Sequence, residues 1–121
     1  MPHTILIAED DTTISSLIQE VVKRMGETPI AAGDGEEAIE IFLTRKIDLI
    51  ITDIKMPKTD GIAFIKKVRE QNREIPIVII TGYGSENNRT LARSYGVKDF
   101  LNKPCSIIEL VHTIKKNLLP K

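Results

Sequence analysis

Short apolar runs alternate along this 121-residue chain with longer segments in which apolar residues recur every three or four positions. The short runs lie at residues 5–8, 29–32, 47–52, 75–81 and 97–101. Three of them, centred on residues 5–8, 49–51 and 77–80, are continuous and rich in branched side chains, which is typical of parallel strands buried on both faces. The runs around Ile30 and Phe100 are weaker, so we expect these two strands at the edges of the sheet.

The segments between the runs have the period of an α-helix. From Ile14 to Met25, apolar residues fall at i, i+3, i+4, i+7, i+8 and i+11, which predicts one helix with one apolar stripe. Apolar clusters at residues 38–43, 64–68 and 107–118 predict the second, third and fifth helices. The fourth helix, expected from Glu86 to Tyr95, has few apolar residues, so we expect little burial and the greatest mobility there.

This alternation of strands and helices predicts a single α/β domain over residues 1–121, with its core at about 4–119. The expected architecture is a doubly wound, flavodoxin-like sheet of five parallel strands in the order 2-1-3-4-5, with five helices. A capping box of Ser106 and Glu109 marks the start of the fifth helix. The length also suits one domain with one substantial core.

Composition narrows the classes of function. Apolar residues make up 41% and charged residues 28% of the chain, as in an ordinary globular protein. The 17 basic and 17 acidic residues cancel, so no overall charge draws the chain to nucleic acid or to an anionic membrane. Cys105 has no second cysteine to pair with, and the sequence has neither a secretion-signal pattern nor an apolar run near the roughly 20 residues of a membrane helix. We therefore expect a cytoplasmic protein that contacts neither nucleic acid directly nor a membrane.

Polar residues follow four of the five expected strands. In chain order they are Glu9 and Asp10, Asp53, Thr81, and Lys103. Ligands of open parallel sheets bind beyond the carboxyl ends of the strands, at the point where the strand order reverses. In the order 2-1-3-4-5 this point lies between the first and third strands, so the three carboxylates would share one pocket.

Three carboxylates in one pocket repel one another and must take up a proton or recruit a cation. Ligands that are all oxygens favour a hard ion such as Mg²⁺. Asp53 is the best candidate for a nucleophile because it ends the central strand, while Asp10 would bind the ion directly and Glu9 through water. Lys103 and Thr81 would then contact phosphoryl oxygens, and the whole set suits phosphoryl transfer to a carboxylate.

Each of these residues also has a plainer explanation when taken alone. Acidic residues after a strand often cap the next helix, and Asp11, Thr12 or Thr13 could do so here. Thr81 could simply bond to the backbone, and Lys103 could be a solvated surface lysine. Their coincidence at four strand ends favours the shared site.

The motifs at these strand ends resemble those of the receiver domains of bacterial two-component systems, from about Thr4 to Leu119. The matching segments are residues 5–11 (ILIAEDD), residues 53–61 (DIKMPKTDG), Thr81-Gly82 and Lys103-Pro104. Glu9 stands where aspartate is commoner in the family, which lengthens one ligand arm. Four ordered motifs at these spacings are highly specific.

The resemblance implies the roles of the pocket residues. Asp53 would be the phosphoacceptor, with Thr81 and Lys103 contacting the phosphoryl group. Mg²⁺ would be bound by Glu9, Asp10, Asp53 and the backbone carbonyl of Lys55. The chain would then be a phosphoacceptor signalling domain, with no catalysis beyond its own phosphotransfer and autodephosphorylation.

The resemblance also implies a conformational switch. Thr81 would move toward the phosphoryl group and Phe100 would turn inward, which changes the face formed by the fourth helix, the fifth strand and the fifth helix. Lys55 and Tyr83 lie where the family tunes the lifetime of the phosphoryl group by controlling the attacking water. The bond between Lys103 and Pro104 is expected to be cis.

The partners that the resemblance implies are a sensor histidine kinase or a histidine phosphotransfer protein upstream, and an output domain or effector protein downstream. The chain could also form a homodimer through the face of the fourth helix, the fifth strand and the fifth helix. The upstream partner would dock on exposed residues of the first helix and of the loop before the fifth helix. These residues are Ile14, Leu17, Ile18, Pro104 and Cys105.

Three other classes of protein stay open at this point. A haloacid dehalogenase-like phosphatase uses a strand-end aspartate with Mg²⁺ and a lysine, but it needs a second aspartate two residues later, where this chain has Lys55. A nucleotide- or flavin-binding turn could lie at residues 82–85 (GYGS), yet the third glycine of G-x-G-x-x-G would fall at Asn87. A degenerate receiver would serve only as a protein-binding scaffold, and against it all the key residues are present.

Overall fold

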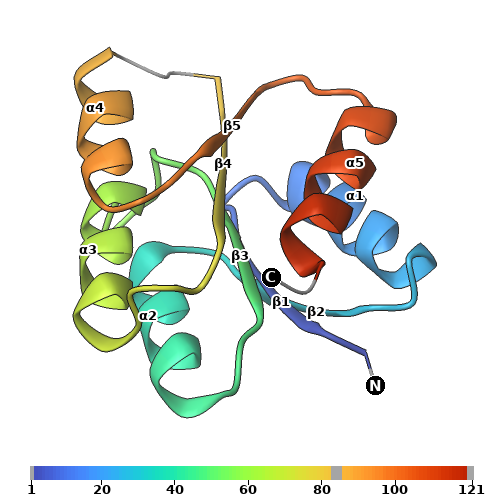
Figure 1. Ribbon diagram of the computed structural model, residues 1–121, viewed down its shortest axis with the longest axis horizontal. Coiled ribbons are helices and arrows are strands. Elements are labelled where there is room, and N and C mark those ends of the chain that lie inside the picture. The colour runs from blue at the N-terminus through green and yellow to red at the C-terminus, as the bar shows by residue number, and fades with distance from the viewer. Residues whose placement is uncertain (1, 83–85, 120–121) are drawn as a thin grey trace.

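The computed structural model describes residues 2–82 and 86–119 (Figure 1). Its five strands are β1 (Thr4–Ala8), β2 (Thr28–Ala32), β3 (Leu49–Thr52), β4 (Ile77–Thr81) and β5 (Asp99–Asn102). They form one parallel sheet in the order β2-β1-β3-β4-β5. The predicted strand order is therefore confirmed.

Five helices connect the strands and cover both faces of the sheet. They are α1 (Thr12–Arg24), α2 (Gly35–Thr44), α3 (Gly61–Gln71), α4 (Glu86–Ser94) and α5 (Ile107–Leu118). Figure 1 shows α1 and α5 on one side of the sheet and α2, α3 and α4 on the other. Two apolar cores result, one on each face of the sheet.

The burial of the strands follows the sequence pattern. Every residue of β3 and β4 is buried, and so is β1 except at Thr4, whereas β2 and β5 are partly exposed. Both weaker strands lie at the edges, as predicted. Pro29, which lacks an N–H donor, is tolerated in β2 because an edge strand pairs on one side only.

Side-chain caps fix where four helices begin. Asp11, Asp34 and Asp60 each accept a backbone N–H from the first turn of α1, α2 and α3. Ser106 does the same for α5, since its Oγ accepts the N–H of Glu109 at 3.0 Å. Each cap satisfies a donor that the first turn of a helix leaves without a helical partner.

The apolar runs of residues 47–52 and 75–81 begin two residues before β3 and β4, and the strands themselves contain the predicted residues 49–51 and 77–80. One expectation from the apolar pattern needs correction. Leu17 and Leu43 lie in predicted apolar stripes, but they are 50% and 59% exposed. Periodic apolar residues show that one face of a helix is apolar, but they do not show whether other elements cover the whole of that face.

Candidate functional site

The register of the sheet brings the acidic residues together. Ala8 pairs with Thr52, so the residues that follow them, Glu9 and Asp53, leave the sheet side by side. The backbone N–H of Asp53 donates to the carbonyl of Ala8 at 3.0 Å, which continues the pairing by one step. Carboxylate oxygens of Glu9, Asp10 and Asp53 lie within 4.8 Å of one another. The predicted three-carboxylate pocket is present.

Lys103 bridges two of these carboxylates. Its Nζ lies 2.6 Å from Oε1 of Glu9 and 2.6 Å from Oδ2 of Asp53. The backbone N–H of Lys103 donates to the carbonyl of Thr81 at 3.1 Å, which extends the pairing of β4 with β5 to the edge of the pocket. The bond between Lys103 and Pro104 is cis, as expected. Lys103 is thus a pocket residue, not a solvated lysine.

Burial and charge act against each other in this pocket. Glu9 is 3% exposed and Asp53 is 6% exposed. Burial raises the pKa of the Glu9 carboxyl, although the hydrogen bond from Lys103 acts in the opposite direction. Burial alone would lower the pKa of Lys103, but its hydrogen bonds to Asp53 and Glu9 outweigh burial and raise it. The lysine therefore stays protonated and serves as the counter-charge of the acidic pair.

Asp11, one of the three residues predicted as possible caps, is the N-cap of α1, so Glu9 and Asp10 do not cap this helix. Glu9 accepts the N–H of Asp11 through Oε2 at 3.1 Å, which fixes its carboxylate in the pocket. Asp10 is exposed, and its side chain makes no hydrogen bond or ion pair with any residue in 2–82 or 86–119. Its carboxylate is available to a ligand.

Two glycines hold the loop of residues 53–60 in place. A Cβ on Gly61 would lie 2.0 Å from the carbonyl oxygen of Asp53, and one on Gly35 would lie 1.7 Å from the carbonyl oxygen of Thr59. The N–H of Gly61 also donates to the carbonyl of Ile54 at 2.7 Å. Gly35 could not be recognised from the sequence, because nothing local to residues 33–35 shows that another loop passes so close.

The remaining predicted site residues surround the pocket. Thr81 is 1% exposed at the end of β4. Phe100 is half-buried in β5, where it pairs with Ile79. Lys55 is exposed in the loop that follows Asp53, and Tyr83 lies outside the described residues.

The donor set fits a hard divalent cation. All three acidic side chains offer oxygen ligands, and oxygen ligands are those that Mg²⁺ prefers. The carboxylates also carry more negative charge than Lys103 alone can neutralise. A cation of charge +2 would complete the charge balance of the pocket.

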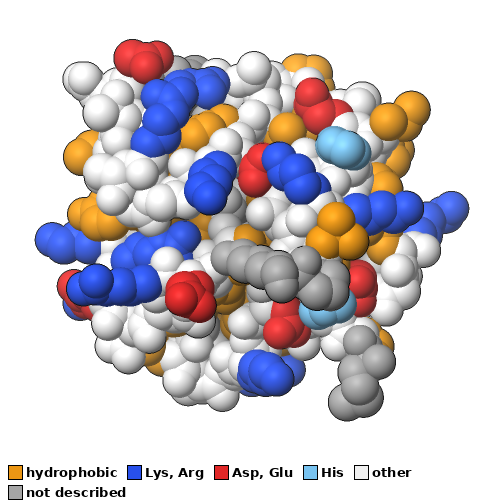
Figure 2. Space-filling view, in the orientation of Figure 1, with side chains coloured by type: hydrophobic (Ala, Val, Ile, Leu, Met, Phe, Trp, Pro, Cys, Tyr) orange, Lys and Arg blue, Asp and Glu red, His pale blue; other side chains and the backbone are white. Residues whose placement is uncertain are grey.

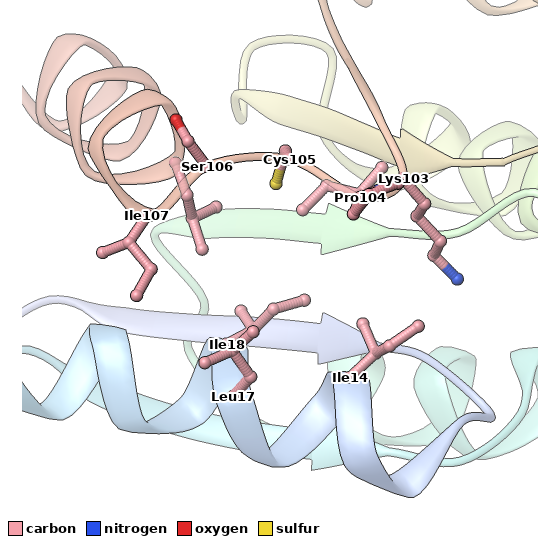
Figure 3. Close-up of a pocket in the computed structure, with 10 residues that line it drawn as sticks. Ile14, Leu17, Ile18, Lys103, Pro104, Cys105, Ser106 and Ile107 are labelled. Atoms are coloured by element: carbon pink, nitrogen blue, oxygen red, sulfur yellow. The ribbon is translucent and has the colours of Figure 1, made fainter.

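An apolar groove of about 330 Å³ lies next to the pocket, between α1 and the loop that joins β5 to α5 (Figure 3). Ile14, Leu17 and Ile18 point from α1 toward this loop, which carries Pro104 and Cys105. All five residues predicted to dock the partner therefore line one groove, although Ile18 is 3% exposed and so is buried, not exposed as expected. Lys103 belongs to both the groove and the pocket, so the two sites are contiguous.

The protein family of this chain follows from its similarity to known proteins. The model of the response regulator receiver domain family matches residues 5–115, so the chain belongs to this family. It is a receiver domain of two-component response regulators, which is a signalling fold and not a classical enzyme family. Within residues 2–82 and 86–119, no helix combines the length and apolar character needed to cross a membrane.

Two relatives of known sequence are transcriptional regulatory proteins. CpxR of Escherichia coli (strain K12) is 39% identical over 113 residues, which are 93% of this chain and 48% of that protein. The alkaline phosphatase synthesis regulator PhoP of Bacillus subtilis (strain 168) is 36% identical over 115 residues, which are 95% of this chain and 48% of that protein. The chain spans about half the length of these relatives.

The fold matches solved structures of the family. The chemotaxis protein CheY4 of Vibrio cholerae superimposes with a TM-score of 0.91 at 27% identity, over 98% of this chain and 100% of that chain. The flavodoxin-like architecture with five helices is therefore confirmed.

Proposed function

We propose that this chain is an active phosphoacceptor, in which Asp53 takes a phosphoryl group from the phosphohistidine of a sensor histidine kinase or a histidine phosphotransfer protein. The observation that carries the proposal is the single pocket in which Lys103 contacts both Asp53 and Glu9, with the exposed carboxylate of Asp10 beside them. A scaffold that had lost phosphorylation would have no need to keep this buried set of charges, which is costly to desolvate.

In the proposed transfer, a carboxylate oxygen of Asp53 attacks the phosphorus atom. The bond from phosphorus to the histidine nitrogen breaks, and its electron pair remains on that nitrogen. Lys103 keeps its proton and moves its hydrogen bond from the Asp53 carboxylate to a phosphoryl oxygen. Its raised pKa supports this role, because a protonated lysine is the form that stabilises the added negative charge.

Mg²⁺ would be held by Glu9, Asp10, Asp53 and the backbone carbonyl of Lys55. When bound, it neutralises the carboxylates and the phosphoryl oxygens during transfer. Glu9 and Asp53 already lie in fixed positions, since the N–H of Asp11 bonds one and that of Ile54 bonds the other. Such fixed ligands are pre-organised, so little reorganisation is needed when charge builds up.

The switch is part of the same proposal. Thr81 moves toward the phosphoryl group, Phe100 turns inward, and the face formed by α4, β5 and α5 changes. Lys55 and Tyr83 tune the phosphoryl lifetime by shielding the acyl phosphate from water. An output domain, an effector protein or a second copy of the chain then binds the changed α4-β5-α5 face; the proposal includes no direct contact with nucleic acid.

The upstream partner docks on the groove between α1 and the β5-α5 loop. The groove is apolar and adjoins the pocket, so a helix seated there would bring its phosphohistidine next to Asp53. Leu17 and Ile107, which are 50% and 55% exposed, would supply the buried apolar contacts. The cytoplasmic location expected from the sequence belongs to this proposal as well.

Intact-protein mass spectrometry tests the phosphoacceptor. The chain is incubated with acetyl phosphate and Mg²⁺, with and without EDTA. We expect a gain of one phosphoryl group that disappears with EDTA and in Asp53→Asn. The matched control is Asp11→Asn, which makes the same change beside the pocket and keeps a good helix cap, and it should be labelled as the parent is.

The opposite results have distinct meanings. Stable label on Asp53→Asn would show that Asp53 is not the acceptor. No label on any sample would be checked with beryllofluoride, which mimics a bound phosphoryl group and does not hydrolyse away. Failure to bind beryllofluoride would contradict the proposal and favour the scaffold.

A further inference from the structure

The half-buried ring of Phe100 lies beneath two arginines of α4. The guanidinium carbons of Arg89 and Arg93 are 5.4 Å and 5.2 Å from the ring centroid. The two residues are four positions apart, so they project from the same face of the helix. In Figure 2, Lys and Arg side chains gather at the upper left, between α4 and β5. Both distances are within the range of a cation–π interaction.

Arg89 makes a second contact with β5. Its Nη2 donates to Oδ1 of Asn102 at 3.0 Å, and Asn102 directly precedes Lys103 of the pocket. Arg93 is oriented by an ion pair of 3.5 Å with Glu86 in the first turn of α4. The arginines therefore connect α4 to β5 at the ring and, through Arg89, at a residue next to the acidic site.

These contacts stand out because α4 has little buried apolar surface of its own. Ala92 is its one buried residue, in contrast to α1, α3 and α5, each of which buries three or more residues. The burial of a single methyl group contributes little to docking a helix on a sheet. Side-chain contacts from Arg89 and Arg93 consequently supply attachments between α4 and β5 that the buried apolar surface of α4 does not.

We propose that Arg89 and Arg93 are positioning residues that hold Phe100 and α4 in the arrangement of the unphosphorylated protein and so set the threshold of the switch. The inference rests on the proposed function, since it takes Phe100 as the aromatic residue that turns. Inward rotation of the ring breaks both cation–π contacts and frees α4 from β5. The arginines contact Phe100 and Asn102, whereas the contacts within the acidic pocket are made by Glu9, Asp53 and Lys103.

Thermodynamic linkage gives the expected sign. Contacts that exist only in the unphosphorylated arrangement stabilise it, and they must lower the affinity for any ligand that favours the other arrangement. Removal of the contacts therefore raises that affinity. For exposed cation–π pairs we expect an increase of about threefold for Arg89→Gln and about tenfold when both arginines are replaced.

The test is a titration with beryllofluoride at saturating Mg²⁺, in which fluorine NMR separates the bound from the free ligand. Arg89→Gln, Arg93→Gln and the double variant should bind beryllofluoride more tightly than the parent. The matched control is Arg73→Gln, which removes the same charge from the exposed residue beyond the end of α3 and should leave the affinity unchanged. Arg89→Lys keeps a cation over the ring and should lie between the parent and Arg89→Gln.

A double-mutant cycle separates the ring contact from a general effect on α4. Phe100→Leu keeps an apolar side chain but removes the aromatic face, so Arg89→Gln should have a smaller effect in that background. Equal effects in the two backgrounds would overturn the ring contact as the cause, and unchanged or weaker binding by the arginine variants would overturn the inference while leaving the proposed function intact. A parent protein that binds no beryllofluoride at all would contradict both.

Discussion

The two sides of the pocket are built in different ways. On the side of β1 and β3, the loop of residues 53–60 is fixed by main chain against main chain, where Gly35 and Gly61 allow approaches that any Cβ would block. On the side of β4 and β5, helix α4 buries only Ala92 and contacts β5 through the side chains of Arg89 and Arg93. We call the first the rigid side, because its main-chain contacts cannot shift independently. We call the second the replaceable side, because a single substitution can remove each of its side-chain contacts.

This difference suggests that one side binds the ligands and the other side changes its arrangement when they bind. A site that binds a cation and a phosphoryl group needs its ligands held in advance, because reorganisation costs affinity. A surface that reports the event must instead have two arrangements of similar free energy. Backbone packing suits the first requirement, and a few exposed side-chain contacts suit the second.

The largest expected effect comes from Gly61→Ala, which introduces a steric clash on the rigid side. The new methyl would lie 2.0 Å from the carbonyl oxygen of Asp53, so the main chain at the pocket must shift. We expect the free energy of unfolding to fall by about 3 kcal/mol, as in severe overpacking, and Mg²⁺ affinity to be lost. Urea unfolding and calorimetric titration of Mg²⁺ would measure the two effects.

The control for this variant is Gly33→Ala. The nearest atom to a Cβ there is Oε1 of Glu37 at 3.8 Å, which is an ordinary contact with a flexible side chain. Both the free energy of unfolding and the Mg²⁺ affinity should stay close to those of the parent. A Gly61→Ala protein that behaved like Gly33→Ala would show that the loop yields easily and that the rigid side is not rigid.

The second prediction uses pH, because the buried carboxylates of Glu9 and Asp53 lie on the rigid side. Burial raises the pKa of Glu9 above its ordinary value of 4.5, so the folded state binds a proton more tightly than the unfolded state does. The resulting stabilisation is full below that value and is lost as the pH rises through the pKa of the folded protein. Without metal, the parent should therefore lose stability relative to Glu9→Gln as the pH rises above about 4.5.

Chemical denaturation at a series of pH values would measure this difference. Arg89→Gln, on the replaceable side, should keep the same pH dependence as the parent. Added Mg²⁺ should reduce the loss at higher pH, because a ligand carboxylate must be ionised to bind the ion. If the free energy of unfolding varied with pH in the same way in the parent and in Glu9→Gln, the raised pKa of Glu9 would be contradicted.

The sequence predicted the rigid side better than the replaceable one. The branched runs of β1, β3 and β4 indicated buried parallel strands, and the pairing of β1 with β3 in the predicted order brings Glu9 and Asp53 together. Neither the approach of Gly35 to Thr59 nor the position of Arg89 over Phe100 could be predicted, because each depends on how loops and side chains pack outside the pairing of the strands. Such contacts leave no periodic pattern in the sequence.

Ala92→Gly should have the smallest effect of the three and is the sharpest test of the division between the two sides. Loss of the buried methyl and of helix propensity should lower the free energy of unfolding by about 1 to 2 kcal/mol. Ala63→Gly, at an exposed position of α3, loses helix propensity alone and should cost no more than about 1 kcal/mol. Because α4 contributes no ligand to the acidic pocket, Mg²⁺ affinity should be the same in both variants and the parent. Weaker Mg²⁺ binding by Ala92→Gly would mean that α4 helps to hold the pocket, and the two sides would then act as one unit.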